Sequence, residues 1–372
     1  MEFVPYAEFK NIEFIAEGGF SKIYKAIWID GPITWEIEKR MYNRDGNKTI
    51  VLKEINNSKN ISSKELNELI IYCSLRKTYT NDINRYYGIT QYPVTLNYVL
   101  ITDYYDLGDL THYIKNKFFS ITWIEKLARL LNIAFGLTEL HNDNIIHKDF
   151  HSGNILISSN IAKSLAAISD FGLSKSSLNN DDDNEIYGII PYVAPEVLQG
   201  QKYTKASDIY SFGMIMWELM TGRRPFWDRN HDVDLIIEIC DGIRPPIVTN
   251  APEGYIKLMK KCWHSDPNKR PSAYDIWDTF NQRYGEEKII SLSTMIKSAN
   301  FERSLRSQNF TLELKKRKLN DNLIDEDDNN DKIIIKIESL ENKITDYLTK
   351  ELEFDIEDKG AEYVTRDIGF DI

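Results

Sequence analysis

The 372-residue sequence lacks the marks of secreted, membrane-spanning and general nucleic-acid-binding proteins. Its three cysteines, at positions 73, 240 and 262, have neither close pairing nor metal-site spacing, which favours a reduced intracellular setting. The N-terminus shows no signal peptide, and no apolar run approaches the length of a membrane span. A net charge of −11 argues against general affinity for nucleic acids. These absences predict a cytoplasmic protein and leave entry into the nucleus open.

The composition of the chain changes near residue 285. Hydrophobic residues make up 42% of the sequence, as in globular proteins. The last proline is Pro271, the last tryptophan is Trp277, and from Glu286 onward 21 acidic residues face 14 basic ones. Before that point the balance is 36 to 32. The predicted domains are an N-terminal extension over residues 1–8, a folded domain over 9–285 and an acidic, partly disordered tail over 286–372.

The tail carries an apolar pattern and a basic cluster but no catalytic pattern. Apolar residues at 333, 337, 340, 344 and 347 follow four-three spacing, which predicts an amphipathic helix over 332–350. This stripe could contact a partner, form a dimer or dock on the folded domain. The basic run over 315–318 fits either a nuclear-import patch or, more simply, the solvated face of a helix.

Strand and helix patterns occupy different parts of the folded domain. β-branched and aromatic residues predict strands over 12–28, 49–55 and 98–102. One helix is predicted over 62–76, where Ser62 and Glu65 fit a capping box. Beyond Gly108, apolar spacing predicts helices over 123–141, 208–221, 232–240, 253–263 and 272–284. The fold class is therefore α+β, with a small β-rich lobe that contains one main helix, followed by a larger helical lobe.

Five short stretches carry side chains suited to phosphate chemistry. In IAEGGFSKIYKA, residues 15–26, glycines lie in a turn between strands, where backbone N–H groups can approach phosphate oxygens. Lys53 lies on an apolar strand, and Glu68 on the next helix could hold it. HKDFHSGN (147–154) and SDFG (169–172) adjoin two short apolar strands that can form a hairpin. Each stretch alone also fits an ordinary hairpin, solvated charges or turn-forming Asp and Asn residues.

In this order, the five stretches resemble the motifs of the eukaryotic protein kinase family. Further matches are APE at 194–196, SDIYSFG at 207–213 and CWHSDPNKRPSA at 262–273, so the resemblance covers residues 9–285. The phrases LHNDNIIHKDFHSGNIL and PYVAPEVLQG look like the tyrosine-kinase-like group expanded in some mycorrhizal fungi.

This resemblance implies a bilobal protein kinase fold, with the N-lobe over about 9–102 and the C-lobe over about 106–285. It implies ATP and Mg²⁺ as cofactors, a protein substrate and a role in intracellular signal transduction. It also implies a structural ion pair between Arg270 and Glu196.

By the same resemblance, a few residues carry the catalytic step. Asp149 would accept the proton of the substrate hydroxyl, and Lys53, held by Glu68, would grip the α and β phosphates. His151 stands where many Ser/Thr kinases have a lysine that contacts the γ-phosphate. The residues implied as Mg²⁺ ligands are Asn154 and Asp170.

The resemblance also places the nucleotide. Thr102 would guard the pocket behind adenine, and the backbone of residues 103–105 would bind the adenine ring. Asp109 is a candidate for the ribose hydroxyls and equally for a helix N-cap. The expected nucleotide contacts are Ala16, Glu17, Gly18, Gly19, Phe20, Ser21, Ile23, Lys53, Thr102, Asp103, Tyr105, Asp109, Asn154, Leu156 and Asp170.

Departures from the family pattern leave alternatives open. Ala16 and Ser21 replace the first and third glycines of the usual Gly-x-Gly-x-x-Gly. Lys148 replaces the usual Arg before the catalytic Asp, which keeps the charge but loses the bidentate fork. The activation segment over 172–193 is either a phosphate-controlled loop or an unregulated one. The motifs favour Ser/Thr over Tyr or dual specificity, and the alternative function is a catalytically weak or inactive kinase-like scaffold that binds nucleotide or partners.

Overall fold

The computed structural model describes residues 2–18, 21–36, 40–59, 67–75, 81–160, 164–176, 186–247, 251–252 and 254–284. The capping box expected at Ser62 and Glu65 lies outside these residues, and so does the tail with its expected helix. Within the described ranges, no helix combines the length and the apolar character needed to cross a membrane.

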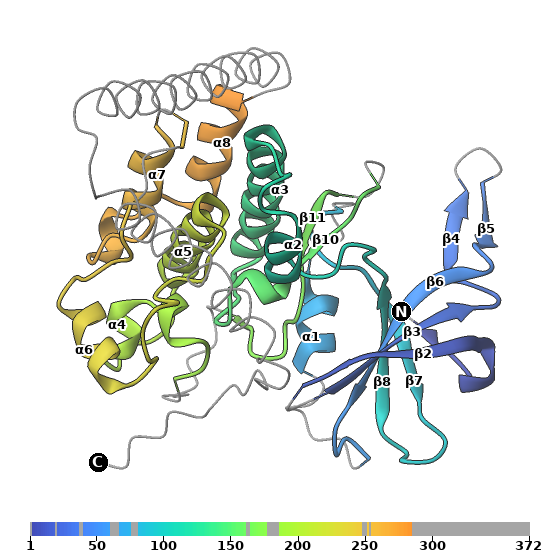
Figure 1. The fold of residues 1–372 in the computed structure, drawn as a ribbon. Coiled ribbons are helices and arrows are strands. Elements are labelled where there is room, and N and C mark those ends of the chain that lie inside the picture. The colour runs from blue at the N-terminus through green and yellow to red at the C-terminus, as the bar shows by residue number, and fades with distance from the viewer. Residues whose placement is uncertain are drawn as a thin grey trace, which may run out of the picture. The chain divides into compact units, whose positions relative to one another are not determined.

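A six-stranded sheet forms the N-terminal lobe (Figure 1). The strands lie in the order β1-β7-β8-β6-β3-β2, and every neighbouring pair is antiparallel except β1 with β7. They are β1 (Glu2–Phe3), β2 (Phe9–Glu17), β3 (Ser21–Trp28), β6 (Lys48–Ile55), β7 (Tyr86–Gln91) and β8 (Tyr98–Asp103). Four of them, β2, β3, β6 and β8, confirm the strands predicted from the sequence.

Alternation along β6 decides where Lys53 points. Ile50 and Leu52 are buried on one face of the sheet, where they join a core cluster with Trp28. Because successive side chains of a strand point to opposite faces, Lys53 lies on the other face. There it meets Glu68 on the helix α1 (Asn67–Ser74), which is the main helix of this lobe.

A second pair of strands stands apart from the large sheet (Figure 1). β4 (Ile33–Glu36) and β5 (Met41–Arg44) pair in an antiparallel hairpin, and the rings of Trp35 and Tyr42 meet at 4.9 Å between centroids. These two side chains are 52% and 70% exposed. The sequence patterns did not predict this hairpin, because its apolar residues face water instead of following the alternation of a half-buried strand.

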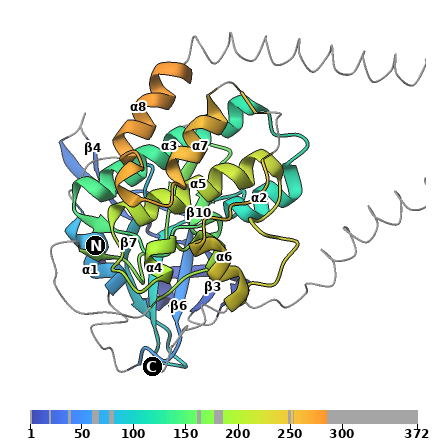
Figure 2. The same cartoon turned by 90° about the vertical axis from the view of Figure 1, so that its left-hand side faces the viewer.

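Seven helices are described in the C-terminal lobe. α8 lies beside α3, and α7 lies beside α5 (Figures 1 and 2). The helices are α2 (Leu110–Lys117), α3 (Trp123–Asn142), α4 (Pro195–Leu198), α5 (Lys205–Thr221), α6 (Val233–Cys240), α7 (Tyr255–Cys262) and α8 (Ala273–Tyr284). All five helices predicted beyond Gly108 are present, and the bilobal α+β prediction is confirmed.

The buried helix α5 begins at Lys205, three residues before its predicted start. The reason is a capping box between Thr204 and Ser207, which the sequence analysis did not use. Every side chain from Ser207 to Met220 is buried, which explains the apolar pattern around the whole helix. Gly222 ends the helix with a φ of +79°, and a Cβ there would lie 2.6 Å from the Phe118 ring. Both the backbone and the space therefore require glycine.

Four short strands flank the two loops that carry HKDFHSGN and SDFG. β10 (Ile155–Ile157) and β11 (Ala166–Ile168) form the predicted antiparallel hairpin, with Ile155 opposite Ile168. β9 (Ile145–Ile146) pairs with β12 (Lys175–Ser176). The two pairs place the segments before and after HKDFHSGN beside the segments before and after SDFG.

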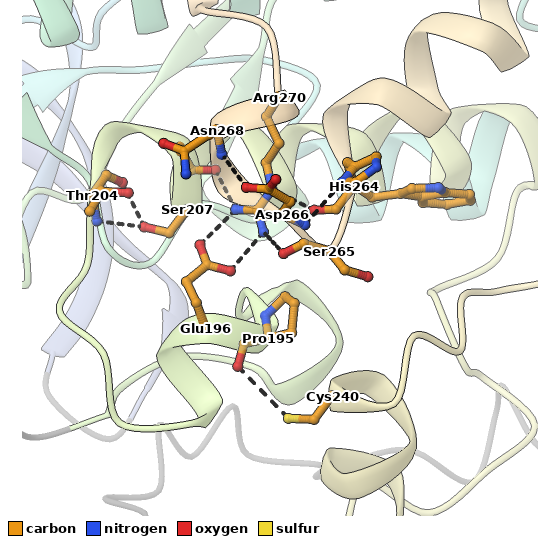
Figure 3. Close-up of polar contacts among 12 residues, drawn as sticks. Pro195, Glu196, Thr204, Ser207, Cys240, His264, Ser265, Asp266, Asn268 and Arg270 are labelled. Atoms are coloured by element: carbon orange, nitrogen blue, oxygen red, sulfur yellow. Dashed lines mark hydrogen bonds and ion pairs between the residues drawn. The ribbon is translucent and has the colours of Figure 1, made fainter.

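The predicted ion pair between Arg270 and Glu196 is present (Figure 3). Both guanidinium NH₂ groups donate to the carboxylate at 2.6 Å, and the remaining N–H groups donate to the carbonyls of His264, Ala206 and Ser265. The pair joins the short helix α4 to the segment before α8. Because each of the five N–H groups has an acceptor, the buried charge is fully satisfied.

Candidate functional site

The Asp208 carboxylate of α5 accepts hydrogen bonds from the backbone of the loop that carries HKDFHSGN. One carboxylate oxygen accepts from the backbone N–H of His147 at 2.9 Å, and the other accepts from that of Lys148 at 3.1 Å. His141 of α3 also lies 2.9 Å from Asp208 through Nε2. This buried carboxylate holds Lys148 in the left-handed region, with a φ of +70°, and so sets the direction of the next residue, Asp149.

Asp149 presents one carboxylate oxygen that no described residue binds tightly. Asn154 donates through Nδ2 to the Asp149 carbonyl at 2.8 Å and to Oδ2 at 3.3 Å. The other oxygen, Oδ1, is buried without a hydrogen-bond partner among the described residues, and Nε2 of His151 lies 3.5 Å from it. Burial raises the pKa of Asp149, but His151, His147 and Asn154 together outweigh burial, and the net pKa lies below its usual value.

His151 is buried beside Asp149, and its ring is oriented by the backbone. Nδ1 accepts a hydrogen bond from the N–H of Gly153 at 3.0 Å, so in this geometry Nε2 carries the ring proton and faces Asp149. Burial lowers the pKa of His151. Attraction to Asp149, with smaller contributions from Glu218 and Asp170, outweighs burial, so the net pKa lies above its usual value.

Lys53 lies between two carboxylates. Its Nζ is 2.9 Å from Oε2 of Glu68 and 3.0 Å from Oδ1 of Asp170, and Tyr86 donates its hydroxyl to the other oxygen of Glu68. Burial lowers the pKa of Lys53, but the two carboxylates outweigh it and raise the pKa above its usual value. Glu68 shares this single cation with Asp170, so burial dominates and raises the pKa of Glu68.

Asp170 sits in a strained turn directly after β11. Its φ is +61°, a left-handed value that non-glycine residues adopt only when their surroundings hold them. Phe171 anchors the turn, because its buried ring lies 6.2 Å from the Tyr86 ring and 5.6 Å from the His147 ring. The Asp170 side chain is nevertheless 45% exposed, and attraction to Lys53 outweighs burial and lowers its pKa.

The β10–β11 hairpin brings Asn154 beside the Asp170 turn. Both the N–H and the hydroxyl of Ser169 donate to the Asn154 carbonyl, at 2.9 and 3.0 Å. Since Nδ2 of Asn154 is used on Asp149, its amide oxygen is the atom that can face a metal. An amide oxygen and a carboxylate are hard donors of the kind Mg²⁺ prefers, so these two residues fit the ion.

The expected nucleotide residues fall on the strands and the connection around the cleft. Ala16 and Glu17 end β2, Ser21 and Ile23 begin β3, and the N–H of Gly18 donates to the Ser21 carbonyl at 2.9 Å. Gly19 and Phe20 lie outside the described residues.

Thr102 and Asp103 end β8, and Tyr105 follows them as a buried residue. Leu156 of β10 forms an isolated antiparallel bridge with Asp109. Asp109 caps α2, because its Oδ1 accepts from the His112 N–H at 2.8 Å. The N-cap reading is therefore confirmed, and contact with ribose stays a prediction.

Lys148 uses its charge on aromatic rings. Its Nζ lies 5.6 Å from the Tyr187 ring centroid and 5.1 Å from that of Tyr203. The hydroxyl of Tyr203 accepts from the Tyr187 N–H at 3.0 Å and donates to the Tyr187 carbonyl at 2.5 Å. The replacement of the usual Arg is visible in the sequence, but no sequence pattern indicates these two rings, which come from distant segments.

The sequence analysis also missed Asn67, Tyr86 and Asp208. Asp208 lies inside the quoted stretch SDIYSFG, so the motif could have pointed to it. Tyr86 and Asn67 belong to no quoted motif, and their contacts with Glu68 and with the Asp170 turn appear only once the chain is folded.

Comparison with known proteins gives consistent matches. The family model described as protein tyrosine and serine/threonine kinase matches residues 9–280. The chain is 31% identical over 279 residues to a probable serine/threonine-protein kinase of Dictyostelium discoideum, with 73% of this chain and 16% of that protein covered. It is 35% identical over 182 residues to a putative serine/threonine-protein kinase/receptor of Acanthamoeba polyphaga mimivirus, covering 48% and 11%. It is 36% identical over 193 residues to ephrin type-B receptor 2 of Gallus gallus, covering 50% and 19%. The chain thus spans less than a fifth of each of these relatives.

Proposed function

This chain belongs to the protein tyrosine and serine/threonine kinase family, and on that premise we propose that it transfers the γ-phosphate of ATP to a hydroxyl group of a protein. The observation that carries the proposal is that Lys53 lies between two carboxylates near Asp149, whose buried Oδ1 has no hydrogen-bond partner among the described residues. These residues come from four separate segments. Their three carboxylates outnumber the single lysine, which packing of the fold alone would not require.

Asp149 is the group that would orient and deprotonate the acceptor. Its lowered pKa keeps it ionised near neutral pH, so Oδ1 can accept the proton of a substrate hydroxyl. The hydroxyl oxygen forms a bond to the γ-phosphorus, and the bond from that phosphorus to the β–γ bridging oxygen breaks, which leaves ADP. His151 holds Oδ1 in place from 3.5 Å and adds positive charge when it is protonated.

The remaining residues would position and neutralise the phosphates. Lys53 would contact the α and β phosphates while Glu68 keeps its ammonium group over the cleft. Asn154 and Asp170 would hold Mg²⁺, which supplies charge neutralisation to the phosphate oxygens when bound. The ends of β2 and β3 would cover the nucleotide, and residues 102–105 with Leu156 would line the adenine site.

We favour serine and threonine as acceptors, with tyrosine as the less favoured one. The relatives from Dictyostelium and the mimivirus carry serine/threonine-protein kinase names, whereas ephrin type-B receptor 2 shows that the likeness extends further. The proposal also includes a kinase domain over 9–285, an intracellular signalling role and a partner contact through the tail over 286–372.

The test is γ-phosphate transfer from Mg-ATP to peptides that offer Ser, Thr or Tyr. Asp149→Asn is expected to reduce transfer about 10²- to 10⁴-fold, because the base is lost and the shape is kept. Asp234→Asn is the matched control, since it makes the same change at an exposed position of α6.

Wild-type transfer at the rate of Asp149→Asn, from folded protein, would overturn the kinase activity and favour the scaffold alternative. Labelling confined to tyrosine would overturn the acceptor preference but leave the reaction standing.

A further inference from the structure

Asn67 makes an unusual set of contacts from α1 to the Asp170 turn. Its side-chain nitrogen donates to the carbonyl of Gly172 at 2.9 Å and to that of Ser174 at 2.9 Å. The carbonyl of Phe171 lies 3.4 Å away and shares these donors. Carbonyl oxygens only accept hydrogen bonds, so the NH₂ group of the amide has to face them. One side chain thereby holds three backbone groups that directly follow Asp170.

The turn needs such a hold. Asp170 is in the left-handed region, and the backbone of the turn itself gives its side chain only a long hydrogen bond, of 3.4 Å from the Gly172 N–H, beside the Lys53 contact at 3.0 Å. Left-handed backbone at a non-glycine residue persists only when neighbouring contacts determine it. The ring of Phe171 supplies one such contact, and the amide of Asn67 supplies another through the backbone carbonyls.

Asn67 also directly precedes Glu68, which is 2.9 Å from Lys53, and Lys53 is 3.0 Å from Asp170. Two neighbouring residues of α1 thus contact the same turn. Asn67 binds its backbone directly, and Glu68 is linked to Asp170 through Lys53. A shift of α1 would disturb both contacts together.

We propose that Asn67 is a positioning residue: its amide fixes the backbone of residues 171–174 so that the Asp170 carboxylate faces the metal. The effect on catalysis rests on the proposed kinase function, whereas the effect on metal-dependent nucleotide binding does not require transfer. Asn67 contacts the backbone of the turn and acts through the Asp170 carboxylate.

Asn67→Asp is the sharpest variant, because it keeps the shape and replaces the donor with an oxygen that repels the three carbonyls. Asn67→Ala removes the donor without adding charge, and it serves if Asn67→Asp does not fold. Asn116→Asp in α2 is the matched control, since its amide donates to the carbonyl of His112 at 3.0 Å on an exposed helix surface.

The first measurement is the Kd for ADP with and without Mg²⁺, together with hydrogen exchange of residues 171–176. In both Asn67 variants, the factor by which Mg²⁺ lowers the Kd for ADP is expected to fall about 10- to 100-fold. The backbone amides of the turn should exchange hydrogen faster. ADP affinity without Mg²⁺ should change less than about threefold. The fold-decrease in kcat should be larger than the fold-change in KM for ATP. Asn116→Asp should match the wild type in each respect.

Two results would overturn the proposal. One is that the Asn67 variants match Asn116→Asp in metal-dependent binding, exchange and kcat. The other is an equal loss of ADP affinity with and without Mg²⁺, which would make Asn67 a packing residue of α1. A metal-specific loss of ADP affinity in the Asn67 variants, together with no phosphate transfer by the wild type, would support Asn67 as a positioning residue and overturn the proposed function.

Discussion

In the cleft, Lys53 contacts two carboxylates, whereas in the C-terminal lobe Arg270 holds a single carboxylate with both of its NH₂ groups. The Arg270 side chain is 0% exposed, and all of its N–H groups have acceptors. The cleft keeps an excess negative charge, and the Asp170 carboxylate is 45% exposed. The cluster around Lys53, called the open cluster, has negative charge that could bind a further cation. In the cluster around Arg270, called the closed cluster, every guanidinium N–H group already has an acceptor.

On the proposed function, this difference separates a cluster that binds a ligand from a cluster that stabilises the fold. Unpaired buried charge costs free energy, so it persists where something binds to it. The closed cluster also has regular backbone at Arg270, whereas the open cluster includes the left-handed Asp170. Substitutions in the two clusters should therefore affect different quantities.

The largest effect on stability is expected in the closed cluster. Arg270→Leu leaves the Glu196 carboxylate buried without a cation and removes donors from three carbonyls. The free energy of unfolding should fall by about 3–5 kcal/mol, measured by urea denaturation. The control is Arg229→Leu, which breaks the exposed pair with Glu238 and should cost less than about 1 kcal/mol. Equal losses in the two variants would contradict the comparison.

Removing a buried cation that has no carboxylate partner is expected to raise the free energy of unfolding, opposite to the effect of removing Arg270. Lys126 of α3 is 5% exposed, its Nζ lies 4.0 Å from the Phe118 ring centroid and 5.0 Å from that of Trp123, and among the described residues it has no ion pair. Burial lowers its pKa from 10.5 to about 8. Below pH 8 the charge is carried in both folded and unfolded states, so the folded state bears the full cost of burying it.

Lys126→Met should therefore raise the free energy of unfolding at pH 7 by about 1–3 kcal/mol, after loss of the cation–π contacts is subtracted. The gain should shrink between pH 8 and 10.5, where the folded wild type releases its proton first. Thermal or urea unfolding of the wild type, Lys126→Met and the exposed control Lys117→Met across this range checks the sign. A loss of stability in Lys126→Met would show that the ring contacts outweigh burial.

Much of the open cluster could be predicted from the sequence because its residues sit in contiguous motifs. Each stretch that holds Lys53, Asp149 or Asp170 also fits an ordinary strand or turn, and the order of the stretches along the chain supplied the resemblance that assigned their roles. The strand hairpin that joins Asn154 to the Asp170 turn was predicted from two short apolar strands, and the pair of Arg270 with Glu196 was predicted through the family resemblance.

The contacts that complete the site could not be predicted in this way. Asn67 reaches residues about a hundred positions later in the chain, and Lys148 meets Tyr203, which lies beyond the activation segment. No local period encodes which distant carbonyl or ring a side chain will meet. The exposed Trp35–Tyr42 hairpin escaped for a different reason, because burial patterns cannot reveal strands that bury little.

A smaller effect on stability is expected in the open cluster. Glu68→Gln removes one of two carboxylates around Lys53 and leaves a balanced pair with Asp170. The Tyr86 hydroxyl still has an oxygen to donate to. The free energy of unfolding should change by less than about 1 kcal/mol, while transfer falls about 10- to 100-fold because Lys53 is less firmly oriented. Glu238→Gln at the exposed pair should leave transfer unchanged. A stability loss as large as that of Arg270→Leu would make the cleft pair structural.

The pH dependence of the same variant gives the smallest and most specific test. Burial raises the folded-state pKa of Glu68 above its ordinary 4.5, in spite of Lys53. An acid whose pKa is raised binds its proton more tightly in the folded state, so stability is lost as pH rises from 4.5 through the folded value. Asp170 has a lowered pKa and acts in the opposite sense, below 3.8, in both proteins. Unfolding free energies measured between about pH 4.5 and 7 should therefore diverge, with Glu68→Gln gaining on the wild type as pH rises. A constant or shrinking difference would mean that Lys53 stabilises the Glu68 carboxylate more than burial destabilises it, and the cleft would then resemble the closed cluster around Arg270.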